Sequence, residues 1–250
     1  MFLTLQHKGK TYKSDLDQPL DISIPLRAGE LNVNAWYAAP VKIEAVRNGD
    51  WIGEVKQGGS VNFRNISFNP HGNGTHTECV GHISREDYSI NQCLKKFFFI
   101  AELITILPET LPNADKVISR SGLEAALGDK KPEALIIRTL SNPPEKINVH
   151  YSHTNPVYLT EEAALFIHER GIDHLLVDMP SVDREEDGGK LLAHRAFWQY
   201  PHNTMMHRTI TELVYIPNHI MDGCFLLNIL IASFENDASP SKPVLYRILS

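Results

Sequence analysis

Short stretches in which apolar and polar residues alternate follow one another through the first half of the chain. Alternation with a period of two is typical of half-buried β-strands, and Gly, Pro and Asn interrupt it at turns. The strands expected from this pattern are residues 3–5, 10–13, 20–24, 43–46, 51–55 and 61–68. The first two would pair as a hairpin, and Pro25 would end the third.

The second half mixes apolar strands with helices. In the clearest helix, residues 160–171, Thr160 can cap the first turn, Glu161 suits its positive end and Gly171 can end it. The remaining elements expected are strands at 97–107, 134–139, 172–178, 208–216, 225–234 and 244–248, short helices at 123–127 and 193–198, and a turn at 237–243. The strand–helix–strand order around the clearest helix predicts an α/β fold.

Composition limits the class of protein. The chain has 250 residues, 42% of them hydrophobic, which is enough for a single domain over residues 1–250 with a substantial core. The net charge is −6 and basic residues cluster only in pairs, so we expect no nucleic-acid partner. The longest apolar runs, residues 97–107 and 224–232, are too short to span a bilayer.

Cysteine usage and the first residues bear on the compartment. The three cysteines are scattered and have no Cys-x-x-Cys spacing, which argues against a disulfide framework. The opening Met-Phe-Leu-Thr-Leu-Gln-His-Lys lacks the charged start and apolar run of a secretory signal. We therefore expect a soluble, cytoplasmic protein without a membrane partner.

Candidate chemistry concentrates between His71 and His82, in the segment His-Gly-Asn-Gly-Thr-His-Thr-Glu-Cys-Val-Gly-His. Beyond Gly74 the chain can run extended, so that His76 and Glu78 point to one side and His82 follows on it. An imidazole and a carboxylate that converge suit a divalent cation such as zinc or manganese, and an imidazole just outside the ligands can move protons. Spacing alone leaves a structural role for these residues about equally open.

Two carboxylates elsewhere are further candidates. Ile210, Glu212 and Val214 share one side of the strand expected at 208–216. A buried carboxylate normally needs a partner or a metal, so either Glu212 belongs to a site or this side of the strand is exposed. Asp178 ends another strand, where sites often gather in α/β sheets, although a loop or cap role is equally open.

The histidine segment is one of several that follow, in order, the motifs of a known family. In the signature His-x-Gly-Thr-His-x-Asp-x-Pro-x-His, four positions match Gly74, Thr75, His76 and His82. The other similar segments are Asp21-Ile-Ser-Ile-Pro-Leu, Leu135-Ile-Ile-Arg-Thr, residues 177–183, Ala193-His-Arg, Thr211-Glu-Leu and residues 237–245. Over nearly its whole length the chain thus resembles the cyclase-like metal-dependent hydrolases, the family of bacterial kynurenine formamidase.

Several positions depart from that signature. Its first histidine aligns with Gly72, while His71 lies one place earlier. Glu78 replaces the usual Asp and is one methylene longer, and Val80 replaces Pro. The site of this chain therefore differs in detail from that of the family.

The resemblance nevertheless implies a set of site residues. They are the metal ligands His76, Glu78, His194 and Glu212, with His71 as a further ligand, and the proton-transfer residue His82. The segment before the last ligand is longer than is usual in the family and contains His202 and His207, either of which could replace His194. The implied cofactor is a divalent metal, zinc or manganese.

The resemblance also implies an activity and a fold. The activity is hydrolysis of an amide, formamide or lactone bond of a small molecule, and no Gly-x-Ser-x-Gly nucleophile motif competes with it. The alternative is a non-catalytic, ligand-binding relative; a structural zinc site is less favoured because such sites prefer Cys ligands. The implied fold is a compact α/β domain with a mixed sheet and flanking helices, assembled as a homodimer.

Overall fold

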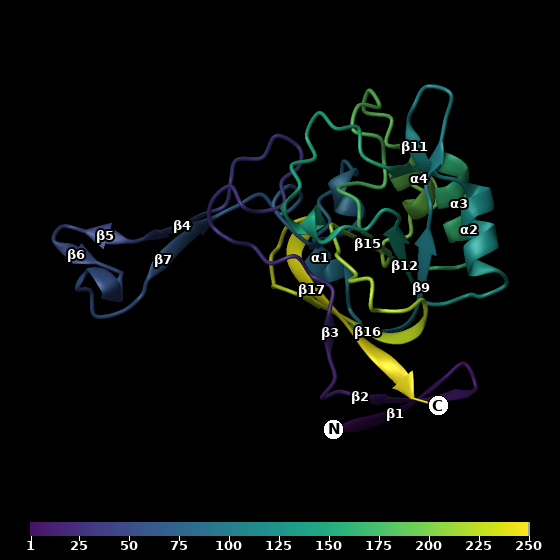
Figure 1. Cartoon of the computed structure of the whole chain (residues 1–250), viewed down its shortest axis with the longest axis horizontal. Helices are drawn as coiled ribbons and strands as arrows, with labels where there is room; N and C mark the ends of the chain where they lie inside the picture. The colour runs from purple at the N-terminus through teal and green to yellow at the C-terminus, as the bar shows by residue number, and fades with distance from the viewer. Residues whose placement is uncertain (250) are drawn as a thin grey trace.

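The computed structural model describes residues 1–249 (Figure 1). The main sheet contains β1 (Phe2–His7), β2 (Lys10–Asp15), β3 (Leu20–Asp21), β8 (His76–Glu78), β9 (Phe98–Ile106), β12 (Ala134–Thr139), β14 (His174–Val177), β15 (Thr209–Glu212), β16 (Gly223–Ile231) and β17 (Ala238–Leu249). Smaller sheets join β10 (Glu109–Thr110), β11 (Lys116–Ile118) and β13 (Tyr158–Leu159), β4 (Lys42–Ala45) and β7 (Arg64–Ser67), and β5 (Arg47–Asn48) and β6 (Trp51–Ile52). The helices are α1 (Ile90–Cys93), α2 (Arg120–Leu127), α3 (Glu161–Glu169) and α4 (Leu192–Trp198), with 3-10 turns η1 (Val55–Gln57), η2 (Val80–His82) and η3 (Pro144–Asn148).

Seven strands of the main sheet close into a barrel. Their order is β17-β16-β9-β12-β14-β15-β8, and β8 pairs again with β17. Strands β9, β12, β14 and β15 run parallel, whereas β8, β16 and β17 pair antiparallel with their neighbours. The α/β class and the mixed sheet are confirmed. The sequence did not predict that the sheet closes into a barrel.

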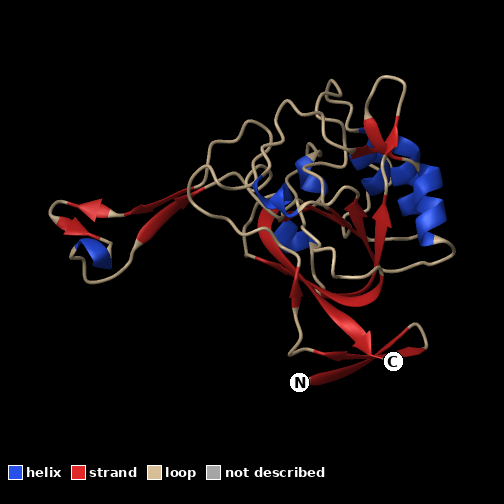
Figure 2. Cartoon of the chain, in the orientation of Figure 1, coloured by secondary structure: helices blue, strands red, loops and turns tan. Residues whose placement is uncertain are grey.

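The two faces of the barrel strands pack into separate cores. In β12, Leu135 and Ile137 face the helices outside the barrel, while Ala134 and Ile136 face its interior. Figure 2 shows α2, α3 and α4 gathered on one side of the barrel. Because both faces are buried, β12 has the nearly continuous apolar sequence of a parallel central strand.

The helix expected at residues 160–171 is confirmed as α3. Thr160 is its N-cap, with the side-chain hydroxyl accepting a hydrogen bond from the Ala163 N–H, and Gly171 follows its end with a φ of 70°. The short helix expected at 123–127 begins earlier than predicted. Its N-cap is Ser119, whose hydroxyl accepts a hydrogen bond from the Gly122 N–H.

Two predicted stretches near the C-terminus are wrong in extent. The strand expected at 208–216 ends at Glu212, because Leu213 turns into the left-handed region with a φ of 55°. The turn expected at 237–243 is absent from the described chain, since residues 238–249 form one long strand that pairs in succession with β8, β16, β3 and β2. Pro243 still contributes through its carbonyl, which accepts from the Ile22 N–H. The prediction from local composition failed here because the strands that pair with this segment lie far away in the sequence.

A hairpin arm over residues 42–67, comprising β4, β5, β6, β7 and η1, extends away from the barrel (Figure 1). Its predicted strands at 43–46, 51–55 and 61–68 are confirmed in part, and none of them belongs to the main sheet. Apolar side chains are exposed along it: Trp51, Val55, Val61, Phe63 and Ile66. The arm therefore presents an uncovered apolar surface at a distance from the core.

Two expectations from the sequence, on disulfides and on membrane-spanning segments, can be compared with all of the described residues. Cys79, Cys93 and Cys224 are free, as the absence of a disulfide pattern in the sequence predicts. Within residues 1–249, no helix combines the length and apolar character needed to cross a bilayer.

Candidate metal centre

Two paired strands carry the centre of the candidate site. His76 and Glu78 lie on β8, and Glu212 on β15 lies directly opposite His76 in the antiparallel register. All three are buried, and Ile210 on the same side of β15 packs in the helix-side core. The alternative that this side of the strand is exposed is therefore wrong. His76 Nε2 lies 3.4 Å from Glu212 Oε2.

His194 reaches the same place from α4. Its Nε2 lies 3.1 Å from Glu78 Oε1 and 3.9 Å from Glu212 Oε1. Its Nδ1 lies 2.5 Å from Oδ2 of Asp183, whose other oxygen accepts from the Ala193 N–H at the start of the helix. One carboxylate thus caps the first turn of α4 and orients the imidazole on it.

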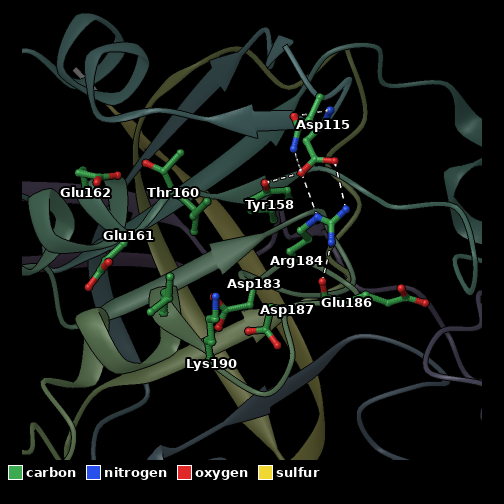
Figure 3. A pocket seen from close by; sticks show the side chains of 13 residues that line it. Asp115, Tyr158, Thr160, Glu161, Glu162, Asp183, Arg184, Glu186, Asp187 and Lys190 are labelled. Carbon is green, nitrogen blue, oxygen red and sulfur yellow. Dashed lines mark hydrogen bonds and ion pairs between the residues drawn. The ribbon is translucent and has the colours of Figure 1, made fainter. Parts of the chain in front are cut away.

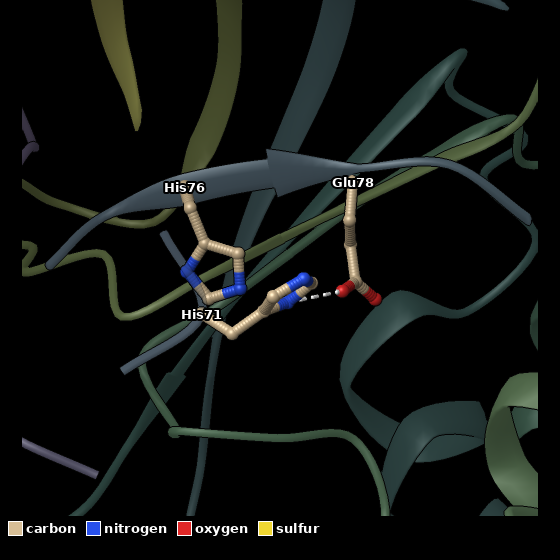
Figure 4. A group of neighbouring side chains, drawn as sticks. All are labelled: His71, His76 and Glu78. Atoms are coloured by element: carbon tan, nitrogen blue, oxygen red, sulfur yellow. Dashed lines mark ion pairs between the residues drawn. The ribbon is translucent and has the colours of Figure 1, made fainter. Parts of the chain in front are cut away.

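His71 completes the group from the loop before β8 (Figure 4). Its Nδ1 lies 3.1 Å from Glu78 Oε2, and its Nε2 lies 2.9 Å from Asp237 Oδ2. The one-place offset from the family signature therefore does not remove His71 from the cluster. Gly72 could not carry a side chain there, because an added Cβ would lie 2.5 Å from the Ala38 Cβ.

His82 lies at the solvent side of the cluster, with 32% of its side chain exposed. The expectation of a continuous extended segment is wrong here, because β8 ends at Glu78 and His82 follows on the 3-10 turn η2. The imidazole still returns to the cluster. Its Nδ1 lies 3.8 Å from Glu78 Oε2 and 3.3 Å from Asp237 Oδ2.

Two buried atoms in the cluster lack hydrogen-bond partners among the described residues, namely His76 Nε2 and Glu78 Oε2. The His71 nitrogen near Glu78 Oε2 lacks the alignment of a hydrogen bond. Buried polar atoms are normally paired, so an unpaired imidazole nitrogen beside an unpaired carboxylate oxygen needs an explanation. Both are metal-ligand atoms of the type that zinc and manganese accept, and the residues present therefore fit a divalent metal.

The histidines are oriented for such a role. His76 directs Nδ1 to the Gly74 carbonyl, His194 directs Nδ1 to Asp183, and His71 directs Nε2 to Asp237. The opposite nitrogen of each ring faces Glu78 or Glu212. Metal-binding histidines usually have this arrangement, in which an outer acceptor holds the second ring nitrogen. In each of the groups His71/His76/Glu78 and Glu78/His82/His194, one ligand-type atom per residue lies within 4.8 Å of the others.

Charge accumulates strongly in this small space. Burial lowers the pKa of His71, but its contacts with Asp237 and Glu78 outweigh burial and raise the pKa to about 10. Burial likewise opposes the shift at His194, yet Asp183 and Glu78 hold its pKa well above the ordinary value. The pKa of Glu78 is lowered, against burial, by the surrounding histidines. Without a metal, protonated histidines would balance the carboxylates, and a bound cation would displace those protons.

The sequence did not single out Asp183 and Asp237 as site residues. Both occur in segments that resemble the family, and Asp237 also begins the turn expected at 237–243, but neither has a local pattern that marks a site. Among the other candidates, Asp178 lies outside the cluster, where its carboxylate binds Thr139 and Lys146. His207 lies beside Asp173 with 61% of its side chain exposed, and the exposed His202 also lies outside the cluster.

Two cavities adjoin the cluster. The larger, about 570 Å³, is lined by the ion pair of Asp115 and Arg184 and reaches the cluster only at Asp183 (Figure 3). A cavity of about 440 Å³ is lined by Gly81 and Asp237 on the side of His82. Because the side chain of His82 is partly exposed, solvent reaches the cluster from this side.

Comparison with known proteins gives a family match. Residues 19–184 match the family described as "Putative cyclase". The matched range includes the histidine segment and ends before His194 and Glu212. Among curated protein sequences, none matches the chain.

Solved structures match the fold over nearly the whole chain. A potential metal-dependent hydrolase with cyclase activity is 13% identical, covers 92% of this chain and 97% of its own, and has a TM-score of 0.66. A predicted metal-dependent hydrolase from Bacillus stearothermophilus is 15% identical, with coverages of 92% and 98% and a TM-score of 0.63. Isatin hydrolase A from Labrenzia aggregata is 17% identical, with coverages of 92% and 93% and a TM-score of 0.63.

Proposed function

The chain belongs to the cyclase family, and from this premise we propose that it is a metal-dependent hydrolase that cleaves an amide, formamide or lactone bond of a small molecule. One observation carries the proposal. Within residues 1–249, His76 Nε2 and Glu78 Oε2 are buried without hydrogen-bond partners, inside a cluster of histidines and carboxylates drawn from β8, β15, α4 and two loops.

The proposed ligands are His76, Glu78, His194 and Glu212, with His71 as a further ligand. Imidazole and carboxylate donors suit zinc or manganese, whereas structural zinc sites favour thiolate ligands. A divalent metal held by these residues supplies Lewis acidity, which activates water and polarises a carbonyl.

The chain's own residues supply the proton transfer and the orientation. His82 takes the proton of the attacking water and returns it to the departing nitrogen or oxygen. Its partial exposure allows contact with both the cluster and an entering substrate. Asp183 holds the His194 ring in place through Nδ1.

The similarity in fold to isatin hydrolases suggests where to search for substrates. Isatin contains a cyclic amide, and the same chemistry applies to N-formyl amines and lactones. We propose that a small cyclic amide, a formamide or a lactone is the substrate, so a panel should contain all three classes.

Metal content tests the proposal first. Elemental mass spectrometry of the purified protein should give near-stoichiometric zinc or manganese, which His76→Ala should abolish. His207→Ala is the matched control, because this exposed histidine lies outside the cluster, and its metal content should equal that of the wild type. Absence of metal in the wild type after incubation with zinc and manganese would contradict the proposal.

Activity on the panel is the second test. Hydrolysis should require the metal, and His82→Ala should lower kcat by about 10²- to 10⁴-fold while the metal stays bound. Activity that survives complete removal of the metal by a chelator would contradict a metal-dependent mechanism. A metal-loaded protein that hydrolyses no member of the panel would favour the non-catalytic, ligand-binding alternative.

A further inference from the structure

Asp237 lies in the cluster although it comes from the C-terminal part of the chain, immediately before β17. Its backbone is fixed beside β8, because its carbonyl accepts from the Cys79 N–H at 3.0 Å and the next residue, Ala238, pairs with Glu78. The strand pairing that closes the barrel thus determines where this carboxylate lies.

One oxygen of Asp237 serves two imidazoles. Its Oδ2 lies 2.9 Å from His71 Nε2 and 3.3 Å from His82 Nδ1, and the two rings lie 4.3 Å apart between centroids. The contacted atoms differ, since one ring presents Nε2 and the other Nδ1. An ionised carboxylate only accepts hydrogen bonds, so it requires a proton on both of these nitrogens.

Gly81 permits this close approach. A Cβ at this position would lie 2.1 Å from the Tyr88 carbonyl oxygen and 3.2 Å from the Asp237 Cβ. A residue with a side chain would push apart the turn that carries His82 and the segment that carries Asp237. The absence of a side chain at position 81 therefore belongs to the same arrangement.

We infer that Asp237 is a positioning residue that fixes the tautomers of His71 and His82. A proton held on His71 Nε2 leaves Nδ1 free to bind a metal beside Glu78. A proton held on His82 Nδ1 leaves Nε2 free to accept a proton from water. The role assigned to His82 and the effect on metal affinity rest on the proposed function, whereas the tautomers do not.

The competing possibility is that Asp237 is itself a metal ligand. One ligand-type atom of each of His71, His82 and Asp237 lies within 4.8 Å of the others, which is close enough for a separate cation. The inferred role is favoured by the hydrogen-bond distances, which place imidazole nitrogens directly against the carboxylate oxygen.

Zinc affinity separates the two possibilities. In a competition titration with a chromophoric chelator, Asp237→Asn should weaken zinc binding by about 10- to 100-fold and leave the number of zinc ions bound at saturation unchanged. Glu235→Gln is the matched control, because this nearby carboxylate binds Asn91 and Gln92 outside the cluster. Loss of one zinc ion per chain at saturation, or an unchanged affinity, would overturn the inference.

Histidine tautomers give a readout that a merely structural role would not change. Long-range ¹H–¹⁵N spectra of protein labelled at histidine should place the His82 proton on Nδ1, with and without zinc, at a pH where the ring is neutral. Asp237→Asn should convert His82 to a mixture of tautomers. The same spectrum in both proteins would overturn the inference, and neither outcome depends on finding a hydrolysed substrate.

Discussion

Asp183 and His194 form a buried pair in which carboxylate Oδ2 lies 2.5 Å from imidazole Nδ1, and the same carboxylate accepts from two backbone N–H groups at the start of α4. Burial raises the pKa of Asp183, but the His194 imidazole and these backbone donors outweigh burial and lower it. Asp183 thus holds both the first turn of α4 and the orientation of the His194 imidazole, which is a candidate metal ligand.

Asp183→Asn should weaken metal binding by about 10- to 100-fold, because the ring of His194 loses the charged acceptor that orients it. Isothermal titration with zinc checks this. Glu186→Gln, a nearby exposed carboxylate, should bind zinc like the wild type. Equal affinities of all three proteins would show that the outer carboxylate does not orient the ligand.

Asp115 should stabilise the fold in a pH-dependent manner. Its carboxylate accepts hydrogen bonds from Arg184, Asn155 and Tyr158, and these hold its pKa below the ordinary value (Figure 3). Since the folded pKa is lowered, the stabilisation is present above the unfolded value of about 3.9 and is lost as the pH falls toward the folded value.

Asp115→Asn should therefore lower the free energy of unfolding at pH 7 by about 1–3 kcal/mol, with a smaller difference from the wild type at pH 3. Urea unfolding at both pH values measures this. Asp129→Asn, in an exposed loop, should leave the free energy of unfolding nearly unchanged. A difference that grows as the pH falls would have the wrong sign for this explanation.

Thr160→Ala should lower the free energy of unfolding by about 1 kcal/mol. The variant removes the hydroxyl that accepts from the Ala163 N–H and leaves that donor of α3 unpaired. Thr160→Ser keeps the hydroxyl and should retain most of the stability. Chemical denaturation distinguishes the two variants, and an equal loss in both would assign the effect to the threonine methyl group.

The arm over residues 42–67 leads to a prediction about the homodimer. An isolated two-stranded hairpin is marginally stable in water, so an arm with exposed Phe63 and Ile66 needs a covering surface, and we propose that a second copy of the chain supplies it. Ile66→Ser should shift the mass measured by light scattering toward the monomer. Leu107→Ser replaces an exposed apolar residue outside the arm and should not cause this shift. A monomeric wild type would contradict the proposal.

The sequence predicted elements best where the structural signal is local. The α3 helix contains its own cap, acidic first turn and terminating glycine, and β12 consists of six buried residues in a continuous run. These features act over a few residues, so they survive into the folded chain. The fold class followed from the order of such elements.

The same reasoning failed where distant strands decide the local conformation. The Ser- and Pro-containing segment after Asp237 has the composition of a turn, yet it forms β17 because β8, β16, β3 and β2 supply its hydrogen bonds. The extended path expected from His76 to His82 ends at Glu78, and a 3-10 turn follows it.

For the candidate site, the sequence by itself determined the chemical types and the core of the cluster. His76, Glu78 and His82 lie within seven residues, and Glu212 stood out as a carboxylate on an apolar side of a strand. The resemblance added His71 and His194 as ligands. Only the tertiary structure brought in Asp183 and Asp237, because a carboxylate that orients an imidazole needs proximity in space rather than a spacing in the chain. Closure of the barrel and the packing of α4 bring these residues close together, and no local sequence pattern predicts either of them.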